Sequence, residues 1–312
     1  MENGALLVTN RSQFPDSANE GSVDILVVGS VNIDTTTYVD HFPNPGETCT
    51  SDENRVSLGG KGLNQALAAA MTGARVVLVC SANPNDIDSI KQATRHLSNL
   101  TLEIQPSSHS TGSAWICVSH TGENFVIVNP GANQMLTLDF LEGSIKKHAP
   151  PLVMLQGEIS SKANSRVMTL CQELNIRVAL NPSPMREGDS SLIESCAVLL
   201  LNKHEASELT GREILSPADA TEVANNLATK NRTVVITMGS EGSVFAGPLF
   251  SGLVPAWKAS SIKDTTGAGD RFAGILCGWL AKGQGLQSSL VRASEAAGKL
   301  CEILQANELR LS

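Results

Sequence analysis

Short, continuously apolar segments recur along the chain, with stretches of helical spacing between them. Six of these segments occupy residues 25–28, 76–79, 152–155, 176–180, 198–201 and 234–236. Their apolar residues do not alternate with polar ones, so both faces of each segment are predicted to be buried, as in parallel strands between two helix layers. The pattern therefore predicts an α/β fold, a three-layer αβα sandwich with a mostly parallel central sheet.

Polar residues follow most of these segments, at the point where each strand would end. They occur at residues 29–34, 156–158, 181, 202–205 and 237–240. Turn and cap preferences alone would account for about half of these positions. Because ligands of open α/β sheets bind at the carboxyl ends of the strands, the coincidence predicts one shared site at that edge.

Two stretches break the pattern, at about residues 35–57 and 110–128, where β-branched and aromatic residues surround turn signals. In the second stretch, residues 114–118 and 125–128 flank a polar turn, which predicts a hairpin. We expect both stretches to form a small β lid that excludes water from the site. Residues 23–312 are predicted to form one domain. Residues 1–22 are polar and lack an apolar signal core, which predicts a disordered leader, with a transit peptide as the lesser alternative.

Composition narrows the class of protein. The 312 residues are 41% hydrophobic and 17% charged, with a net charge of -8. We therefore expect a globular protein that binds neither nucleic acid nor membrane, because it lacks a basic surface and an apolar stretch long enough to cross a bilayer. The seven cysteines include no Cys-x-x-Cys pair, which favours reduced thiols and a cytoplasmic location.

The segment 264–270 reads Asp-Thr-Thr-Gly-Ala-Gly-Asp and runs directly into a pattern of helical spacing. Small residues and free amides at a helix start suit an anion such as phosphate. A carboxylate repels phosphates, so Asp270 at this place favours a role as the base that takes a proton from an attacking hydroxyl. A glycine-rich turn in which Asp270 only caps the helix has the same sequence.

A second glycine cluster comprises Gly59, Gly60, Lys61 and Asn64, ahead of another helical pattern. It is not a Walker A loop, because glycine follows Lys61. The first predicted strand also lacks the Gly-x-Gly-x-x-Gly that typifies dinucleotide binding. Backbone, ammonium and amide groups of this kind can hold a neutral, hydroxylated ligand, although a tight helix entry would show the same residues.

Taken in order, these motifs resemble those of the ribokinase-like PfkB family of carbohydrate kinases, over about residues 23–300. The matching segments are 29–34, 43–48, 59–65, 122–124 with 130–133, 202–205 and 264–270. The last segment is highly specific for the family. The Gly-Gly-Lys-Gly-x-Asn-Gln form at 59–65 favours the members that act on ribose.

The resemblance implies ATP-dependent phosphorylation of the primary 5-hydroxyl of D-ribose, giving ribose 5-phosphate and ADP, with Asp270 as general base. It implies sugar contacts from Asn32, Asp34, Gly59, Gly60, Lys61, Asn64 and Glu158. It implies an ATP side formed by Asn181, Asn202, Glu205, Thr237, Met238, Gly239, Ser240, Gly242, Gly267, Ala268 and Gly269, where the amides of residues 267–270 form the anion hole.

The family resemblance also implies Mg²⁺ held through water by Glu205, a monovalent cation such as K⁺ near Asp264 and Thr266, and a homodimer joined through the β lid. The chain departs from the family pattern at residues 81–86, where we expect a local loop change. It departs again at residues 296–307, which lack the Gly-Ala loop that usually helps contact adenine and complete the cation site. Arg271 is bulkier than the usual residue there, and we expect it to face solvent.

Two alternatives stay open at this point. The substrate could be another pentose or a nucleoside, namely 2-deoxyribose, adenosine or pseudouridine, because a few lid side chains decide hydroxyl recognition. The chain could also be a non-catalytic sugar- or nucleotide-binding sensor on the same fold, since the altered C-terminal segment bears on ATP binding.

Overall fold

The structure is a computed structural model that describes residues 22–51, 53–121, 123–186, 188–248, 250–303 and 309–310. The predicted leader, residues 1–22, lies outside these residues apart from Ser22. Part of the altered C-terminal segment, residues 304–307, lies outside them as well.

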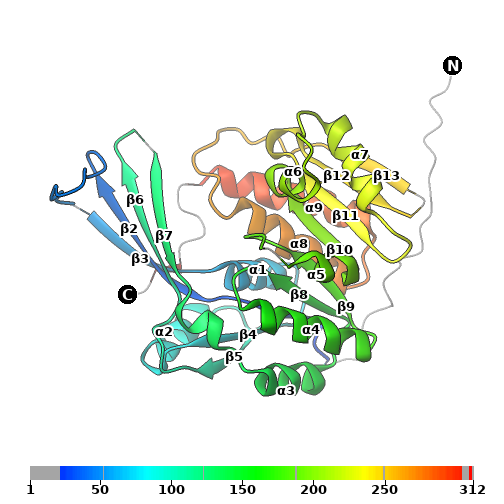
Figure 1. Ribbon diagram of the computed structural model, residues 1–312, viewed down its shortest axis with the longest axis horizontal. Helices are drawn as coiled ribbons and strands as arrows, with labels where there is room; N and C mark the ends of the chain where they lie inside the picture. The colour runs from blue at the N-terminus through cyan, green and yellow to red at the C-terminus, as the bar shows by residue number, and fades with distance from the viewer. Residues whose placement is uncertain are drawn as a thin grey trace.

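A nine-stranded sheet forms the centre of the molecule (Figure 1), with the strand order β13-β12-β11-β10-β9-β8-β1-β4-β5. Pairing is parallel from β11 to β5 and antiparallel between β11, β12 and β13. The strands are β1 (Ile25–Val28), β4 (Val76–Ala82), β5 (Leu100–Pro106), β8 (Leu152–Gln156), β9 (Arg177–Asn181), β10 (Val198–Asn202), β11 (Thr233–Thr237), β12 (Ser243–Gly247) and β13 (Phe250–Val254).

Helices cover both faces of this sheet. Ile25 and Val27 of β1 point into one core, with α1 (Lys61–Ala70), α2 (Pro84–Thr94), α8 (Ala268–Ala281) and α9 (Leu286–Cys301). Leu26 and Val28 point into the other, with α3 (Leu138–His148), α4 (Ser161–Glu173), α5 (Ser190–Ser195), α6 (Lys203–Thr210) and α7 (Pro217–Leu227). The predicted αβα sandwich and the six predicted strands are confirmed.

Three strands of the central sheet have no counterpart in the apolar pattern. β5 and β13 are the two edge strands, and each is partly open to solvent. β12 is fully buried, but it is five residues long, contains Ser243 and Gly247, and pairs in a hairpin with β13. Open edges and small residues remove the continuous apolar run by which a buried strand is recognised.

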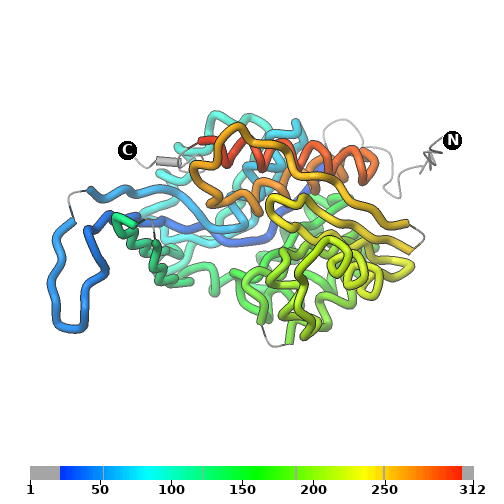
Figure 2. The backbone as a smooth tube through the Cα atoms, turned by 90° about the horizontal axis from the view of Figure 1, so that it is seen from above, coloured from blue at the N-terminus to red at the C-terminus, as the bar shows by residue number. Residues whose placement is uncertain are grey.

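A second, smaller sheet stands away from the sandwich (Figure 2), with the order β14-β3-β2-β6-β7. Its strands are β2 (Asn32–Val39), β3 (Glu53–Gly59), β6 (Ser113–Ser119), β7 (Asn124–Asn129) and the short β14 (Leu309–Arg310). The predicted hairpin is the antiparallel β6–β7 pair, with Trp115 opposite Ile127. β2 begins only four residues after β1 ends, so the small sheet is rooted at the carboxyl edge of the central sheet.

Within the described residues, no helix combines the length and apolarity that a bilayer crossing requires. All seven cysteines are free thiols.

Two glycines of α8 set how closely it packs against α1. A Cβ on Gly274 would overlap the Gln65 carbonyl oxygen and lie 2.6 Å from Ala68 Cβ. One turn later, a Cβ on Gly278 would lie 2.9 Å from the Ala69 carbonyl oxygen. Any larger side chain at these positions would therefore hold the two helices apart.

We predict that Gly274→Ala lowers the free energy of unfolding by about 1–3 kcal/mol, the usual cost of overpacking a core. The control is Gly143→Ala in α3, where an added Cβ meets nothing within 4 Å. That control should be neutral or stabilising by up to about 1 kcal/mol, because alanine favours a helix more than glycine does. Chemical unfolding midpoints test both variants, and equal stability of the two would contradict the packing argument.

Candidate active site

Asp270 lies in the first turn of α8, at the carboxyl edge of the central sheet. The N-cap of this helix, Gly267, has φ 73°, a left-handed conformation that favours glycine. The Asp270 side chain is buried, with 7% of the residue exposed. A buried carboxylate requires hydrogen-bond donors, because burial removes it from water.

α1 supplies those donors. Asn64 Nδ2 donates to Asp270 Oδ2 over 3.1 Å, and Gln65 Nε2 donates to Oδ1 over 2.8 Å. Lys61 Nζ lies 3.9 Å from Oδ1. The glycine cluster and the Asp270 segment, about 200 residues apart in the sequence, therefore meet as predicted.

Gln65 is fully buried and connects Asp270 to the nucleotide side of the predicted site. Its Nε2 donates to Asn181 Oδ1 over 3.0 Å as well as to Asp270, so both amide hydrogens are used. Asn181 Nδ2 donates in turn to the Leu200 carbonyl over 3.1 Å. The Asp270 carboxylate and the Leu200 carbonyl, at the two ends of this series of hydrogen bonds, can only accept. The orientation of both side-chain amides is therefore determined.

Gln65 is not among the residues that the sequence predicts for the site. The sequence carried a signal for it, because Gln65 ends the Gly-Gly-Lys-Gly-x-Asn-Gln motif. What the sequence does not show is that the side chain faces Asp270 rather than the protein core.

A small hollow of about 140 Å³ adjoins Asp270. The predicted site residues that line it are Lys61, Asn181, Asn202, Glu205, Thr237, Gly267 and Gly269. Asn202 and Glu205 also form the capping box of α6, with Glu205 Oε2 accepting from Asn202 N over 2.8 Å. These two residues therefore begin the helix and face the hollow at the same time.

A larger hollow of about 900 Å³ shares Thr237, Gly269 and Phe272 with the small one. Gly239, Ser240, Gly242 and Ala268, which the resemblance assigns to the ATP side, line it. Met238 instead lies in the hydrophobic core. Trp257 and Ile262 also line this hollow and add apolar surface. The sequence did not predict them, because they lie in an irregular segment after β13. Its size and mostly apolar wall suit a flat aromatic base.

The other side of Asp270 carries two further carboxylates. Asp34 Oδ1 accepts from Ala114 N over 2.8 Å, and the absence of a side chain at Gly59 leaves room for its other oxygen. Glu158 Oε2 accepts from Lys61 N over 2.8 Å and also from the Ser30 hydroxyl. Burial raises the pKa of Asp34 to about 6, the backbone donor opposes this rise, and the charge of Glu158 adds to it.

Asn32 is buried beside these groups, where its Oδ1 accepts from Asn133 Nδ2 over 2.8 Å. Asn133 Oδ1 accepts in turn from Val31 N over 3.0 Å. Gly60 has φ 91° and is the N-cap of α1, close to Ser30 and Asn32. The structure therefore places all the predicted sugar residues in one neighbourhood and adds Ser30 and Asn133 as their supports.

The two predicted cation residues lie just before the glycine turn. Asp264 Oδ1 accepts from Thr266 N over 2.8 Å, and the Cys301 carbonyl at the end of α9 accepts from Lys263 N over 2.8 Å. The segment before Asp270 is thus tied to the C-terminal helix.

Arg271, which we expected to face solvent, does so only in part. Arg271 is half-buried and lies against the Met71 sulfur, in a hollow that Trp279 and Arg292 also line. The stacking of α8 on α1 and α9 draws the side chain away from the glycine turn, so it does not line the Asp270 hollow.

Known proteins resemble the chain over most of its length. A ribokinase of Mus musculus is 32% identical over 275 residues, which cover 84% of this chain and 83% of the mouse protein. A deoxyribokinase of Salmonella typhi is 29% identical over 279 residues, which cover 87% and 90% of the two chains. The crystal structure of a ribokinase from Cryptococcus neoformans var. grubii serotype A in complex with ADP superposes with a TM-score of 0.78 at 28% identity, over 93% of this chain and 97% of that one.

The family model described as pfkB family carbohydrate kinase matches residues 23–308. This range contains both glycine clusters, the carboxylates of Asp34 and Glu158, and the residues that line the two hollows. The chain belongs to the PfkB family of carbohydrate kinases.

Proposed function

We propose that this kinase transfers the γ-phosphoryl group of ATP to the primary 5-hydroxyl of D-ribose, giving ribose 5-phosphate and ADP. The observation that carries the proposal is the position of Asp270. Its carboxylate contacts Asn64 and Lys61 on the hydroxyl-binding side and lines the hollow that leads to the nucleotide side. The ribokinases among the relatives support ribose as the sugar.

In this mechanism Asp270 accepts the proton of the attacking hydroxyl while that oxygen approaches the γ-phosphorus in line. Asp34, Glu158 and Asn32 hold the other hydroxyls and orient the sugar. The amides of residues 267–270 and the positive end of α8 stabilise the negative charge that spreads over the transferred group. The protein thus contributes position and electrostatics, and no covalent intermediate is needed.

The hollows fit ATP and Mg²⁺. Apolar wall lines the larger hollow, and Gly269, which has no side chain, lies where the two hollows join. Glu205 and Asn202 provide carboxylate and amide oxygens at the wall of the smaller one, donor types that suit Mg²⁺ through water. Bound Mg²⁺ would offset phosphate charge. Asp264 and Thr266 are our proposed ligands for a monovalent cation such as K⁺.

We also propose a homodimer joined through the small sheet. Every residue of its edge strand β7 is exposed, including Phe125, Ile127 and Val128 at 56–57%. An apolar edge strand open on both faces is usually covered by a partner. Sedimentation that returns the mass of a single chain at micromolar concentration would contradict this proposal.

A second substrate class is supported by the Salmonella deoxyribokinase, which resembles this chain nearly as well as the ribokinases do. Other pentoses and nucleosides therefore stay as alternatives. A non-catalytic sensor on the same fold is disfavoured, because Asp270, its donors and the hollows are all in place.

The direct test of function is ADP release with Mg²⁺ and ATP, measured with ribose, 2-deoxyribose, fructose, adenosine and pseudouridine, with and without K⁺. We expect the largest kcat/KM with ribose. If kcat/KM is larger with another acceptor, that acceptor is the preferred substrate. Turnover that does not depend on K⁺ would contradict the cation site.

Asp270→Asn is the matched control for that assay. It keeps the size of the side chain but removes the base, so kcat should fall by about 10²–10⁴-fold. Ribose and ATP should still raise the melting temperature of this variant. Turnover at the wild-type rate would contradict the role of Asp270.

We predict that Gln65 positions the base. Gln65→Met preserves the volume but removes both hydrogen bonds, and a bond to a charged group contributes about 1.5–3 kcal/mol, so kcat should fall about tenfold or more. KM for both substrates should stay near the wild-type values. The control is Gln105→Met, which removes similar bonds to Met135 and Thr137 far from the site. If both variants lose stability alike and neither loses kcat, Gln65 is only structural.

A pH dependence follows from Asp34. Its carboxylate accepts more strongly from sugar hydroxyls when it is ionised, and its pKa is about 6. Below that pH the KM for ribose should rise by up to about tenfold per pH unit. The Asp34→Asn variant should bind ribose weakly but without this dependence.

The same pKa shift also makes the stability of the folded protein depend on pH. Low pH favours folding, whereas the ionised form needed for ribose binding is favoured at high pH. The folded protein binds this proton more tightly than the unfolded chain, whose value is 3.8. The contribution of Asp34 to stability is therefore greatest at low pH and falls as pH rises through about 6. Asp34→Asn should melt higher than wild type at pH 7.5 and show less advantage at pH 4.5. A constant difference across this range would contradict the shift.

A further inference from the structure

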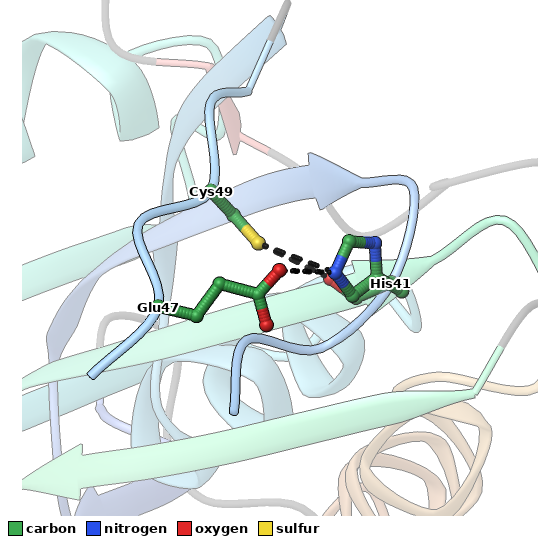
Figure 3. Close-up of side chains that lie close together, drawn as sticks. All are labelled: His41, Glu47 and Cys49. Carbon is green, nitrogen blue, oxygen red and sulfur yellow. Dashed lines mark hydrogen bonds and ion pairs between the residues drawn. The ribbon is translucent and has the colours of Figure 1, made fainter. Parts of the chain in front are cut away.

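The loop between β2 and β3 carries three different metal-binding side chains at one point (Figure 3). His41, Glu47 and Cys49 converge there, with one donor atom of each within 4.8 Å of the others. Among the residues that the structure describes, this is the one group of three such side chains with this geometry. We propose that it is a binding site for a zinc ion.

The distances are close to those that a zinc ion needs. His41 Nε2 lies 2.8 Å from Glu47 Oε1 and 3.9 Å from Cys49 Sγ. In a tetrahedral site with the usual bond lengths, nitrogen and oxygen ligands are about 3.3 Å apart and nitrogen and sulfur about 3.6 Å. Shifts of a few tenths of an ångström in exposed side chains therefore suffice to admit the ion.

Neighbouring groups already orient two of the three ligands. Glu47 Oε2 accepts from Asn44 N over 2.9 Å and from Asn44 Nδ2 over 3.0 Å, so its other oxygen faces His41. His41 Nδ1 lies 3.7 Å from the Asp40 carboxylate, which leaves Nε2 toward the cluster. Outer partners of this kind normally set the orientation of metal ligands.

The loop itself is held at its base and in its middle. Tyr38 of β2 pairs with Glu53 of β3, and Glu47 N donates to the Asn44 carbonyl over 2.9 Å. The intervening Gly46 has φ 86°, which allows this turn. Phe42 packs near Phe125 of β7, with ring centroids 6.4 Å apart. The ligands are therefore presented by an ordered turn.

The donor set selects the ion. One imidazole nitrogen, one thiolate and one carboxylate suit Zn²⁺, whereas Mg²⁺ prefers oxygen ligands alone. On binding, the Cys49 thiol loses its proton to solvent and a zinc–sulfur bond forms. The proton that His41 Nε2 donates to Glu47 Oε1 also leaves for solvent, and Nδ1 carries the proton of the neutral ring. The Nε2 lone pair and Glu47 Oε1 then complete three positions. The His41 and Glu47 side chains are 54% and 35% exposed, so a water molecule can take the fourth.

The site is separate from the kinase centre. The five-residue step from Asp34 to Val39 along β2 spans about 16 Å of strand, and the cluster lies beyond it, at the end of the small sheet that stands furthest from the sandwich in Figure 2. The ion would cross-link residues 41, 47 and 49 of the β2–β3 loop. Neither sugar nor ATP is required for it to bind.

The test is Zn²⁺ binding to the reduced, chelator-treated full-length protein, by competition with a chromophoric zinc chelator. Excess Mg²⁺ occupies the oxygen-only sites. We expect one equivalent per chain, and an affinity at least about tenfold lower in Cys49→Ser and in His41→Gln, because each removes a ligand. Cys117→Ser, which removes a thiol from β6 in the same sheet, is the control and should bind as wild type does.

Cobalt provides a direct readout of the sulfur ligand. Co²⁺ bound to the wild-type protein should show thiolate-to-metal charge-transfer absorption in the near ultraviolet, and Cys49→Ser should lack it. Equal zinc affinity in wild type and Cys49→Ser, or an equal loss in Cys117→Ser, would overturn the proposal. Because the measurement does not involve turnover, its outcome is independent of the substrate assignment.

Discussion

The hydrogen bonds that α1 donates to the buried Asp270 carboxylate are the interaction on which the rest of the site depends. A carboxylate placed beside a phosphate-binding helix start repels its ligand, and burial makes its charge costly. Asn64 and Gln65 offset that cost from the opposite side. They can do so only because α1 and α8 pack closely, and that packing requires Gly274 and Gly278. Helix packing and the position of the base are thus one constraint.

Gln65 extends this constraint across the site. Its two amide hydrogens bond Asp270 and Asn181, and Asn181 bonds the Leu200 carbonyl of β10. A single chain of donors therefore links α8, α1, β9 and β10 at the carboxyl edge of the sheet. A displacement of any of these elements changes the position of the base relative to both hollows. The arrangement is preorganised in the sense that its geometry exists before substrate arrives.

The small sheet connects two regions with different chemistry through one strand. β2 begins at Asn32, beside the carboxylates that we assign to the sugar, and ends at Val39, next to the loop of His41, Glu47 and Cys49. Asp34 on this strand is half-buried, and this burial disfavours its charge. A carboxyl group whose pKa is raised by burial is typical of sites where function has been favoured over stability.

The sequence by itself determined the layers of the sandwich and the edge of the sheet at which the predicted site residues gather. Continuous apolar runs mark strands buried on both faces, and glycines beside Asp270 and Lys61 mark places where backbone must come close to a ligand. These are local signals, and the αβα sandwich followed from them. The edge strands β5 and β13 were not predicted, because a face open to solvent interrupts the continuous apolar run. Met238 was assigned to the site, although its side chain lies in the core.

Only the tertiary structure decided which side chains face one another. Gln65 reaches Asp270 and Arg271 lies against Met71 because of how α8 stacks on its neighbours. Trp257 and Ile262 join the larger hollow from a segment without regular structure, and the raised pKa of Asp34 depends on its burial near Glu158. Long-range packing determines such properties, and no local pattern in a single sequence indicates which distant side chains pack together.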